Sequence, residues 1–289
     1  MLRSTLIRTA IAGMAVLGLA GCGGGGDQLG NDNAGSSPAP SKVSSITVGS
    51  ADFSESQLIA EIYGQALAAK GIEVKKKPNI GNRETYMAAI KDGSVDLVPE
   101  YTGASLAYFD KNSTETDPQK AYDALKKALT PGLEILEMSP ATDEDTIVVT
   151  KATADKYSLK SIGDLKDKNL VAGGSSEFKD YKTLDAGGPL SIKALEDNTI
   201  QVTDLFTTQA VIKDKGWVQL EDPEHILPPN NIVPLIRTDH KSDDVVATLN
   251  AVDAKLTTDT LTDLVKRIDV GKESADAVAK DWLSKNPLS

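Results

Sequence analysis

Two apolar runs of this sequence each end in an aromatic side chain followed directly by threonine. They are residues 95–103, which contain Tyr101 and Thr102, and residues 200–208, which contain Phe206 and Thr207. In open α/β sheets ligands bind beyond the carboxyl ends of the strands, where a ring and a hydroxyl can contact a small molecule. The pattern therefore predicts a binding site for a small molecule. An ordinary strand and turn, with Tyr101 half-buried in the core, is the alternative interpretation.

A segment with the order strand, Gly-Ser turn, acid and phenylalanine precedes each run. The first is Ile46–Phe53 and the second is Leu170–Phe178, whose turn contains Ser175. Two copies of one plan predict two related α/β lobes that offer the same loop ends to a shared cleft. We therefore include Ser175 among the candidate ligand contacts.

The length of 289 residues accommodates two lobes of roughly 100 residues each. Short apolar runs at 146–150 and 232–236 predict two crossings between the lobes. We expect lobe 1 to comprise 46–145 together with 237–289, and lobe 2 to comprise 146–236. Two adjacent connecting strands would form a hinge for closure around a ligand.

Apolar residues recur at helical spacing in two long stretches. The first begins near Ser54 and ends at Gly71, and the second runs from Asp243 to Leu288. This period predicts helices that pack one face against a sheet.

The first residues have the pattern of a secretory signal peptide. An apolar segment at 10–20 follows an arginine-containing start and is too short to span a bilayer. It ends in Leu-Ala-Gly-Cys at 19–22, which closely resembles the lipobox of bacterial lipoproteins. The resemblance implies that residues 1–21 are removed and that Cys22, the sole cysteine, is lipidated. A signal peptide that happens to end near a cysteine is the alternative.

The next stretch, 22–45, holds four consecutive glycines and then mostly Asn, Asp, Ser and Pro. Because this composition cannot bury enough apolar surface to fold, it predicts a flexible tether. Each buried CH₂ of a lipid chain contributes about 0.8 kcal/mol, so lipid chains on Cys22 would hold the protein at a membrane without a spanning helix. We therefore expect an exported protein, lipid-anchored to the outer face of the bacterial cytoplasmic membrane.

The composition is that of a strongly acidic globular protein. The formal net charge is −11, and removal of the two signal-peptide arginines leaves 29 basic against 42 acidic residues, a net charge of −13. Such a surface repels nucleic acid, and we find no basic stripe that would override the repulsion. We expect no nucleic-acid partner, and we expect a monomer.

The sequence offers few residues for catalysis. Its histidines are His225 and His240, both in polar segments, where histidine is more often plain surface than a general base. Gly-x-Ser-x-Gly, His-Glu-x-x-His and phosphate-loop motifs are absent, and Gly23–Gly26 belong to the tether. We therefore predict no enzyme activity, catalytic residue, metal or cofactor. An exported hydrolase or transferase on a two-lobed scaffold is the competing interpretation.

Four motifs together resemble one family. They are Gly49-Ser50-x-x-Phe53-x-Glu55, Asn79-x-Gly81-x-Arg83-Glu84, Asp96-Leu97-x-Pro99-Glu100-Tyr101-Thr102-Gly103 and Leu227-Pro228-Pro229. The family is that of the substrate-binding receptors of osmoprotectant ABC importers, of the glycine betaine, carnitine and choline type. The similarity runs from Ile46 to the C-terminus. It implies an α/β, two-lobed periplasmic-binding-protein-like fold (type 2), with a ligand cleft between the lobes and a two-strand hinge.

In that family a quaternary ammonium group lies in a box of tyrosines, and a cation over an aromatic face gains roughly 0.5 to 2 kcal/mol per ring. Tyr101 matches a box tyrosine, and Phe206 stands where members often have another. Thr146 and Asn230 fall where further tyrosines are common, and both lack a ring. Losing two rings would remove roughly 1 to 4 kcal/mol of binding free energy.

Acids near the predicted site would compensate for the missing rings. The candidates are Asp52, Glu144 and Asp145, and for each the alternative is a solvated loop charge. Ala51 stands where some members place a lysine near the ligand carboxylate. A carboxylate-binding arginine of other members falls in the loop 179–182, where the resemblance does not choose among Lys179, Tyr181 and Lys182.

The resemblance implies a receptor that captures a quaternary-ammonium osmoprotectant and delivers it to an ABC permease and its ATPase subunit. A ligand between Tyr101 of one lobe and Phe206 of the other would favour the closed state that the permease recognises. Two alternatives stay open. One is the same receptor fold with a non-betaine small molecule, and the other is a ligand-sensing lipoprotein without transport.

Overall fold

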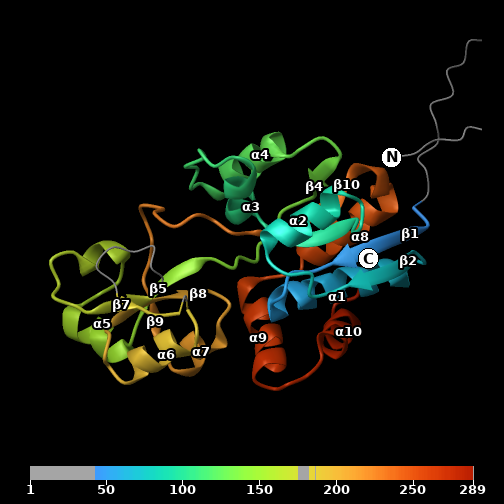
Figure 1. The fold of residues 1–289 in the computed structure, drawn as a ribbon. Coiled ribbons are helices and arrows are strands. Elements are labelled where there is room, and N and C mark those ends of the chain that lie inside the picture. Colours follow the sequence, from blue (N-terminus) through green and yellow to red (C-terminus); the bar gives the residue numbers. More distant parts are fainter. Residues whose placement is uncertain (1–42, 175–181, 186, 289) are drawn as a thin grey trace, which may run out of the picture. The chain divides into compact units, whose positions relative to one another are not determined.

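The computed structural model describes residues 43–174, 182–185 and 187–288 (Figure 1). Several predictions fall on other residues: the signal peptide, Cys22, most of the tether, Ser175, Lys179 and Tyr181 lie outside the described residues. The described part of the chain builds two five-stranded sheets.

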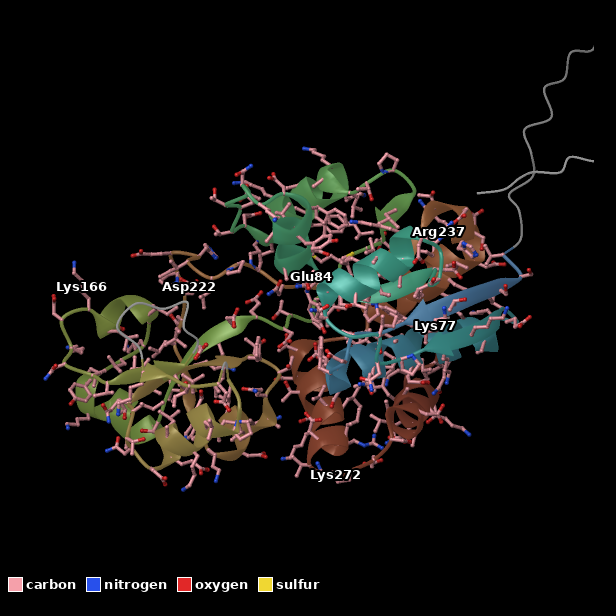
Figure 2. The ribbon with its side chains drawn as sticks, viewed as in Figure 1. Lys77, Glu84, Lys166, Asp222, Arg237 and Lys272 are labelled. Carbon is pink, nitrogen blue, oxygen red and sulfur yellow. The ribbon has the colours of Figure 1, made fainter. Side chains whose placement is uncertain are left out.

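The first sheet has the strand order β2-β1-β3-β10-β4. Its strands are β1 (Ser45–Gly49), β2 (Glu73–Lys77), β3 (Leu97–Tyr101), β4 (Leu133–Ile135) and β10 (Ile232–Arg237). Strand β1 lies parallel to β2 and β3, whereas β10 runs antiparallel to β3 and β4. The edge strand β2 ends in three exposed lysines, Lys75–Lys77, of which Figure 2 labels Lys77. Charge on an edge strand disfavours pairing with another chain.

The second sheet repeats this plan with the order β7-β6-β8-β5-β9. Its strands are β5 (Asp145–Val149), β6 (Ala172–Gly174), β7 (Lys182–Thr183), β8 (Val202–Phe206) and β9 (Val218–Gln219). Strand β6 lies parallel to β7 and β8, and β5 runs antiparallel to β8 and β9. Strands β3 and β8, which end in Tyr101 and Phe206, therefore hold equivalent positions, as the sequence repeat predicted.

Helices cover both faces of the first sheet. One group comprises α1 (Ser54–Ala69), α8 (Asp243–Asp253), α9 (Thr258–Asp269) and α10 (Ala275–Lys285), and the other comprises α2 (Arg83–Lys91), α3 (Thr102–Phe109) and α4 (Pro118–Ala128). Alternate residues of a strand point to opposite faces. Accordingly, Ile232 and Ile236 of β10 pack with the first group, and Val233 and Leu235 pack with the second.

Shorter helices flank the second sheet. They are α5 (Lys151–Tyr157), the 3₁₀ turn η1 (Ile162–Leu165), α6 (Pro189–Glu196) and α7 (Ala210–Asp214), and a further 3₁₀ turn, η2 (Thr238–His240), follows β10. Strand β5 contributes to two cores, with Ile147 and Val149 in one and Val148 in the other. No helix in the described ranges is both long and apolar enough to cross a membrane.

The predicted fold class is confirmed: the chain has an α/β fold of two lobes, each built on its own sheet (Figure 1). The two stretches with helical period form α1 and the group α8 to α10, and Gly71 takes φ 82° just beyond the end of α1.

Strand pairing differs from our lobe ranges at both crossings. The range 146–236 placed residues 232–236 in lobe 2, but these residues pair with β3 and β4 in the first sheet, and Asp145 pairs in the second. A β-branched run predicts a strand, but it does not indicate which sheet the strand joins. The sequence therefore could not assign residues 232–236 to the first sheet. The lobe boundaries remain a proposal, and we now place them near 144 and 231.

Candidate functional site

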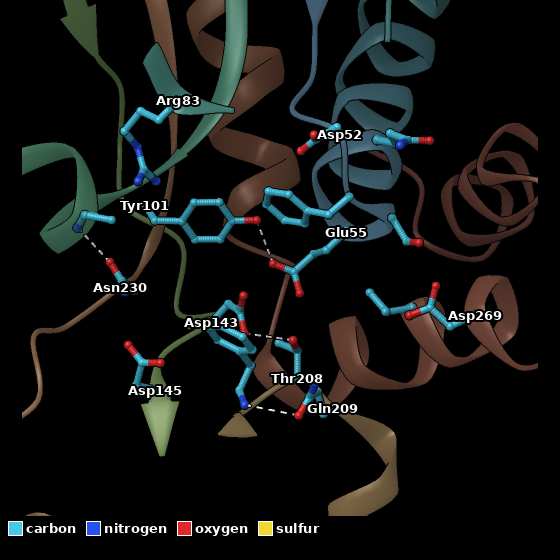
Figure 3. A pocket seen from close by; sticks show the side chains of 16 residues that line it. Asp52, Glu55, Arg83, Tyr101, Asp143, Asp145, Thr208, Gln209, Asn230 and Asp269 are labelled. Atoms are coloured by element: carbon cyan, nitrogen blue, oxygen red, sulfur yellow. Dashed lines mark hydrogen bonds between the residues drawn. The ribbon is translucent and has the colours of Figure 1, made fainter. Parts of the chain in front are cut away.

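A pocket of about 610 Å³ is lined by residues from both lobes (Figure 3). Its volume is in the range of small-molecule sites. It is lined by Asp52, Phe53, Ser54, Glu55, Gln57, Arg83, Tyr101, Ala104, Asp143, Asp145, Phe206, Thr208, Gln209, Asn230, Val265 and Asp269.

Tyr101 and Glu55 form a buried hydrogen-bonded pair in this pocket. Tyr101 is the last residue of β3, and Glu55 lies in the first turn of α1, where the helix dipole favours an acid. The Tyr101 hydroxyl donates to Glu55 Oε1 at 2.7 Å, as Figure 3 shows. The second oxygen, Oε2, is buried and makes no hydrogen bond within the described residues.

Among the described residues, three aromatic rings line the pocket. The Phe53 and Tyr101 ring centroids lie 6.1 Å apart with an interplanar angle of 35°, and Phe206 comes from the end of β8. The Phe53 side chain is 42% exposed, so part of its surface is available to a ligand. Aromatic faces of this kind attract cations.

The pocket is rich in carboxyl groups, and burial changes the pKa of Glu55 and of Asp143. Burial, together with the nearby charge of Asp143, raises the pKa of Glu55 to about 8, although the Tyr101 hydrogen bond opposes the rise. Burial also raises the pKa of Asp143 to about 6 against the hydrogen bond from Thr208, whose hydroxyl donates to Asp143 Oδ1 at 2.8 Å. Asp269, on α9, contributes to the rise at Glu55.

Arg83 is the basic residue among the described lining residues, and its charge is compensated. Its Nε lies 3.3 Å from Oε1 of Glu100, and its Nη2 lies 3.5 Å from Oε2. Glu100 is fully buried and also accepts from the Tyr101 N–H at 2.9 Å, from the Ser105 hydroxyl at 2.8 Å and from the Tyr86 hydroxyl. The Pro-Glu-Tyr motif thus anchors the guanidinium at the pocket wall.

Asn230 and Gly103 fix the start of α3 beside the pocket. The Asn230 side chain accepts from the N–H of Ala104 at 2.9 Å. The N–H of Gly103 donates to the Pro229 carbonyl at 2.8 Å, and a Cβ at Gly103 would lie 2.4 Å from that oxygen. Glycine is therefore required, which explains why Thr-Gly and Pro-Pro occur together in this sequence.

The two segments that connect the sheets, 142–144 and 230–231, are hydrogen-bonded to each other. The N–H of Asp143 donates to the carbonyl of Asn230 at 3.0 Å, and the N–H of Asn230 donates to Glu144 Oε1 at 3.3 Å. An isolated bridge also joins Thr142 to Asn231. The chain therefore passes between its two sheets at adjacent strands, as a two-strand hinge requires.

Some residues predicted from the sequence line this pocket. They are Tyr101, Phe206, Asp52, Asn230 and Asp145. The structure thus brings the aromatic ends of β3 and β8 to one site.

Other predicted residues lie elsewhere. Thr102 is buried, where its hydroxyl donates to the Pro229 carbonyl at 3.1 Å. Ala51 is buried in the core with α2. Thr146, Thr207 and Glu144 line a separate pocket of about 400 Å³ that also contains His225.

Sequence reasoning missed several lining residues as candidate contacts. Phe53, Glu55 and Arg83 belong to the same four motifs as Tyr101. Their presence in these motifs could have identified them as ligand contacts. Asp143 directly precedes Glu144, one of the candidate acids of the sequence analysis. Asp269 carried no signal, because it reaches the pocket only through the packing of the C-terminal helices.

Comparisons with known proteins place this geometry in a family. The chain matches the substrate binding domain of the ABC-type glycine betaine transport system over residues 44–183 and 175–285. It is 27% identical to the glycine betaine-binding protein YehZ of Escherichia coli (strain K12), over 83% of this chain and 90% of that protein. It is 26% identical to the ergothioneine transport permease/ergothioneine binding protein EgtU of Helicobacter pylori (strain G27), over 83% of this chain and 47% of that protein.

A similar fold is seen in a crystal structure of a glycine betaine/carnitine/choline ABC transporter protein. It superposes with a TM-score of 0.74 at 21% identity, over 83% of this chain and 98% of that one. The family match covers nearly all of the described residues, with both sheets included. The chain therefore belongs to the family of substrate-binding domains of ABC-type glycine betaine transport systems.

Proposed function

We propose that this protein captures a quaternary ammonium solute in the 610 Å³ pocket and delivers it to the permease of an ABC importer. The observation that carries the proposal is the arrangement of aromatic rings around buried carboxyl groups at the ends of β3 and β8. A permanent cation cannot shed its charge, so it needs ring faces and acids that replace its hydration. Family membership supports the same solute class.

In this proposal Tyr101, Phe53 and Phe206 contact the methyl groups of the ligand. Phe53 supplies a ring that Thr146 and Asn230 do not. Glu55 and Asp143 line the pocket with these rings, and a bound cation would favour their ionised forms. Acids therefore replace part of the aromatic box.

Closure about the hinge would couple binding to transport. A ligand that contacts Tyr101 and Phe206 touches both lobes, so it binds the closed arrangement more tightly than the open one. The population shift can be no larger than this difference in affinity. The permease, with its ATPase subunit, would recognise the closed receptor.

The proposed location is the outer face of the cytoplasmic membrane, with a signal peptide at 1–21 and a lipid anchor on Cys22. The Leu-Ala-Gly-Cys sequence supports this proposal, and so does the extracytoplasmic role of the family. We further propose a monomer that binds its ligand without chemical change. Recovery of intact ligand after prolonged incubation with the protein tests the last point.

A second candidate is the same receptor with a non-betaine small molecule. This candidate stays open because relatives of similar identity to this chain carry different ligand names. A ligand-sensing lipoprotein without transport is distinguished by the absence of a permease and a P-loop ATPase encoded nearby.

Isothermal titration of the purified protein tests the proposal. The panel contains glycine betaine, choline, carnitine, ergothioneine and an uncharged solute of similar size. We expect binding in the micromolar range for at least one methylammonium compound and none for the uncharged solute. Binding of the uncharged solute alone would contradict the proposal and favour a receptor with another ligand class.

A further inference from the structure

We propose that the pocket selects ligands that carry a net positive charge and discriminates against zwitterions that also carry a carboxylate. This inference rests on the proposed function, because it specifies which quaternary ammonium compounds the same site accepts. It concerns the end of the ligand that is remote from its methylated nitrogen.

The first observation is the charge of the described pocket wall. Its five carboxyl groups come from three separate parts of the chain: Asp52 and Glu55, Asp143 and Asp145, and Asp269. Asp269 is also the last residue of α9, so the negative end of that helix dipole adds to its charge. A ligand carboxylate would meet like charges from several directions, which opposes its binding.

The second observation is that the guanidinium on this wall already has its counter-ion. Arg83 pairs with the fully buried Glu100 through both Nε and Nη2. Glu100 is itself held by donors from Tyr86, Tyr101 and Ser105, so this carboxylate is fixed in place. A ligand carboxylate at Arg83 would have to share the guanidinium with Glu100. It would therefore bind more weakly than at an arginine without a counter-ion.

The third observation identifies what the site offers to the remote end of a ligand. Glu55 Oε2 is buried at the pocket wall and makes no hydrogen bond within the described residues. A bound cation favours the ionised form of Glu55, in which this oxygen is a buried acceptor, and that form suits a ligand that brings a donor. The N-terminal turn of α1 would attract an anion, but Asp52 and Glu55 place acids at that turn. A hydroxyl or an amine therefore suits this position, and a carboxylate does not.

Choline and glycine betaine form a matched pair for the test, because both carry a trimethylammonium group and differ in a hydroxymethyl or a carboxylate. Titration of each into the purified protein at low salt should give at least about thirtyfold tighter binding of choline. Equal or tighter binding of glycine betaine overturns this inference and leaves the proposed function standing. Failure of every methylammonium compound of the panel to bind, in a protein that unfolds cooperatively, overturns the proposed function as well.

Variants test whether the acids cause the selectivity. Asp143→Asn keeps an oxygen for the Thr208 hydroxyl, and Asp269→Asn changes an exposed side chain, so the double variant should remain folded. We expect its choline-to-betaine affinity ratio to fall at least about fivefold, mainly through weaker choline binding. Asp155→Asn, on α5 and outside the pocket wall, is the matched control and should leave the ratio unchanged. A double variant with the wild-type ratio contradicts the inference.

Discussion

At the scale of single residues, Tyr101 has two separable roles, a ring at the pocket wall and a hydroxyl bound to Glu55. Tyr101→Ala removes both, and we expect affinity for a methylammonium ligand to fall at least about tenfold, because burial and cation attraction are both lost. Tyr101→Phe keeps the ring, so its loss should be clearly smaller. Titration calorimetry of both variants measures the difference, and an unchanged affinity in Tyr101→Ala would remove this residue from the site.

The residues of the site were only partly predictable. Tyr101 and Phe206 were found because an aromatic followed by threonine at a strand end is a local pattern. The pairing of Glu55 with Tyr101 joins residues 46 positions apart, and Asp143 reaches both only through the fold. Local spacing carries no information about such contacts, which depend on how the sheet brings loop ends together.

At the scale of elements, the start of α3 depends on a close backbone approach. Gly103→Ala would place a methyl group 2.4 Å from the Pro229 carbonyl oxygen and 3.2 Å from Pro228 Cβ. Both the helix and the Pro-Pro segment would have to shift, so we expect a destabilisation of about 1–3 kcal/mol. Urea unfolding measures the change in the free energy of unfolding.

A matched control for this prediction lies in η1. Within the described part of the chain, a Cβ at Gly163 meets only the Ser161 hydroxyl oxygen, at an ordinary 3.7 Å. Gly163→Ala should therefore leave the stability nearly unchanged. Equal stabilities for the two variants would show that the approach of Gly103 to Pro229 is not a constraint on the fold.

Helices and strands were more predictable from the sequence than the pairing of the strands. The period of apolar residues indicated α1 and the C-terminal helices, because an amphipathic helix carries its own pattern. Strand β10 was predicted as a strand, but its sheet was not. Its residues alternate between two cores, and an alternating apolar strand fits either sheet equally well.

At the scale of the whole molecule, the two sheets have the same topology, and their central strands β3 and β8 both end at a pocket that is rich in acids. Burial gives Glu55 a pKa of about 8 and Asp143 a pKa of about 6 without ligand. A bound cation favours the ionised form of both groups and so lowers both pKa values. Ligand binding should therefore release protons, and affinity should rise as the pH increases from 6 to 8.

Stability of the unliganded protein should follow the opposite trend. The pKa of Glu55 is raised in the folded state from its ordinary value of 4.5 to about 8, so the folded state holds this proton more tightly than the unfolded state. The stabilisation is present in full below pH 4.5 and is lost as the pH rises towards 8. Glu55→Gln removes this loss, so the variant should be more stable than the wild type at pH 8 and should bind a cation more weakly.

Calorimetry in two buffers with different ionisation enthalpies measures the proton release directly. At pH 7 Glu55 is mostly protonated in the free protein, so up to about one proton should leave for each cation bound. Glu55→Gln should lose most of this release, whereas Asp155→Asn on α5 should keep it. A binding enthalpy that does not depend on the buffer, in a protein that binds choline tightly, would mean that the buried acid stays protonated and that the cation is held by the aromatic rings and the remaining acids alone.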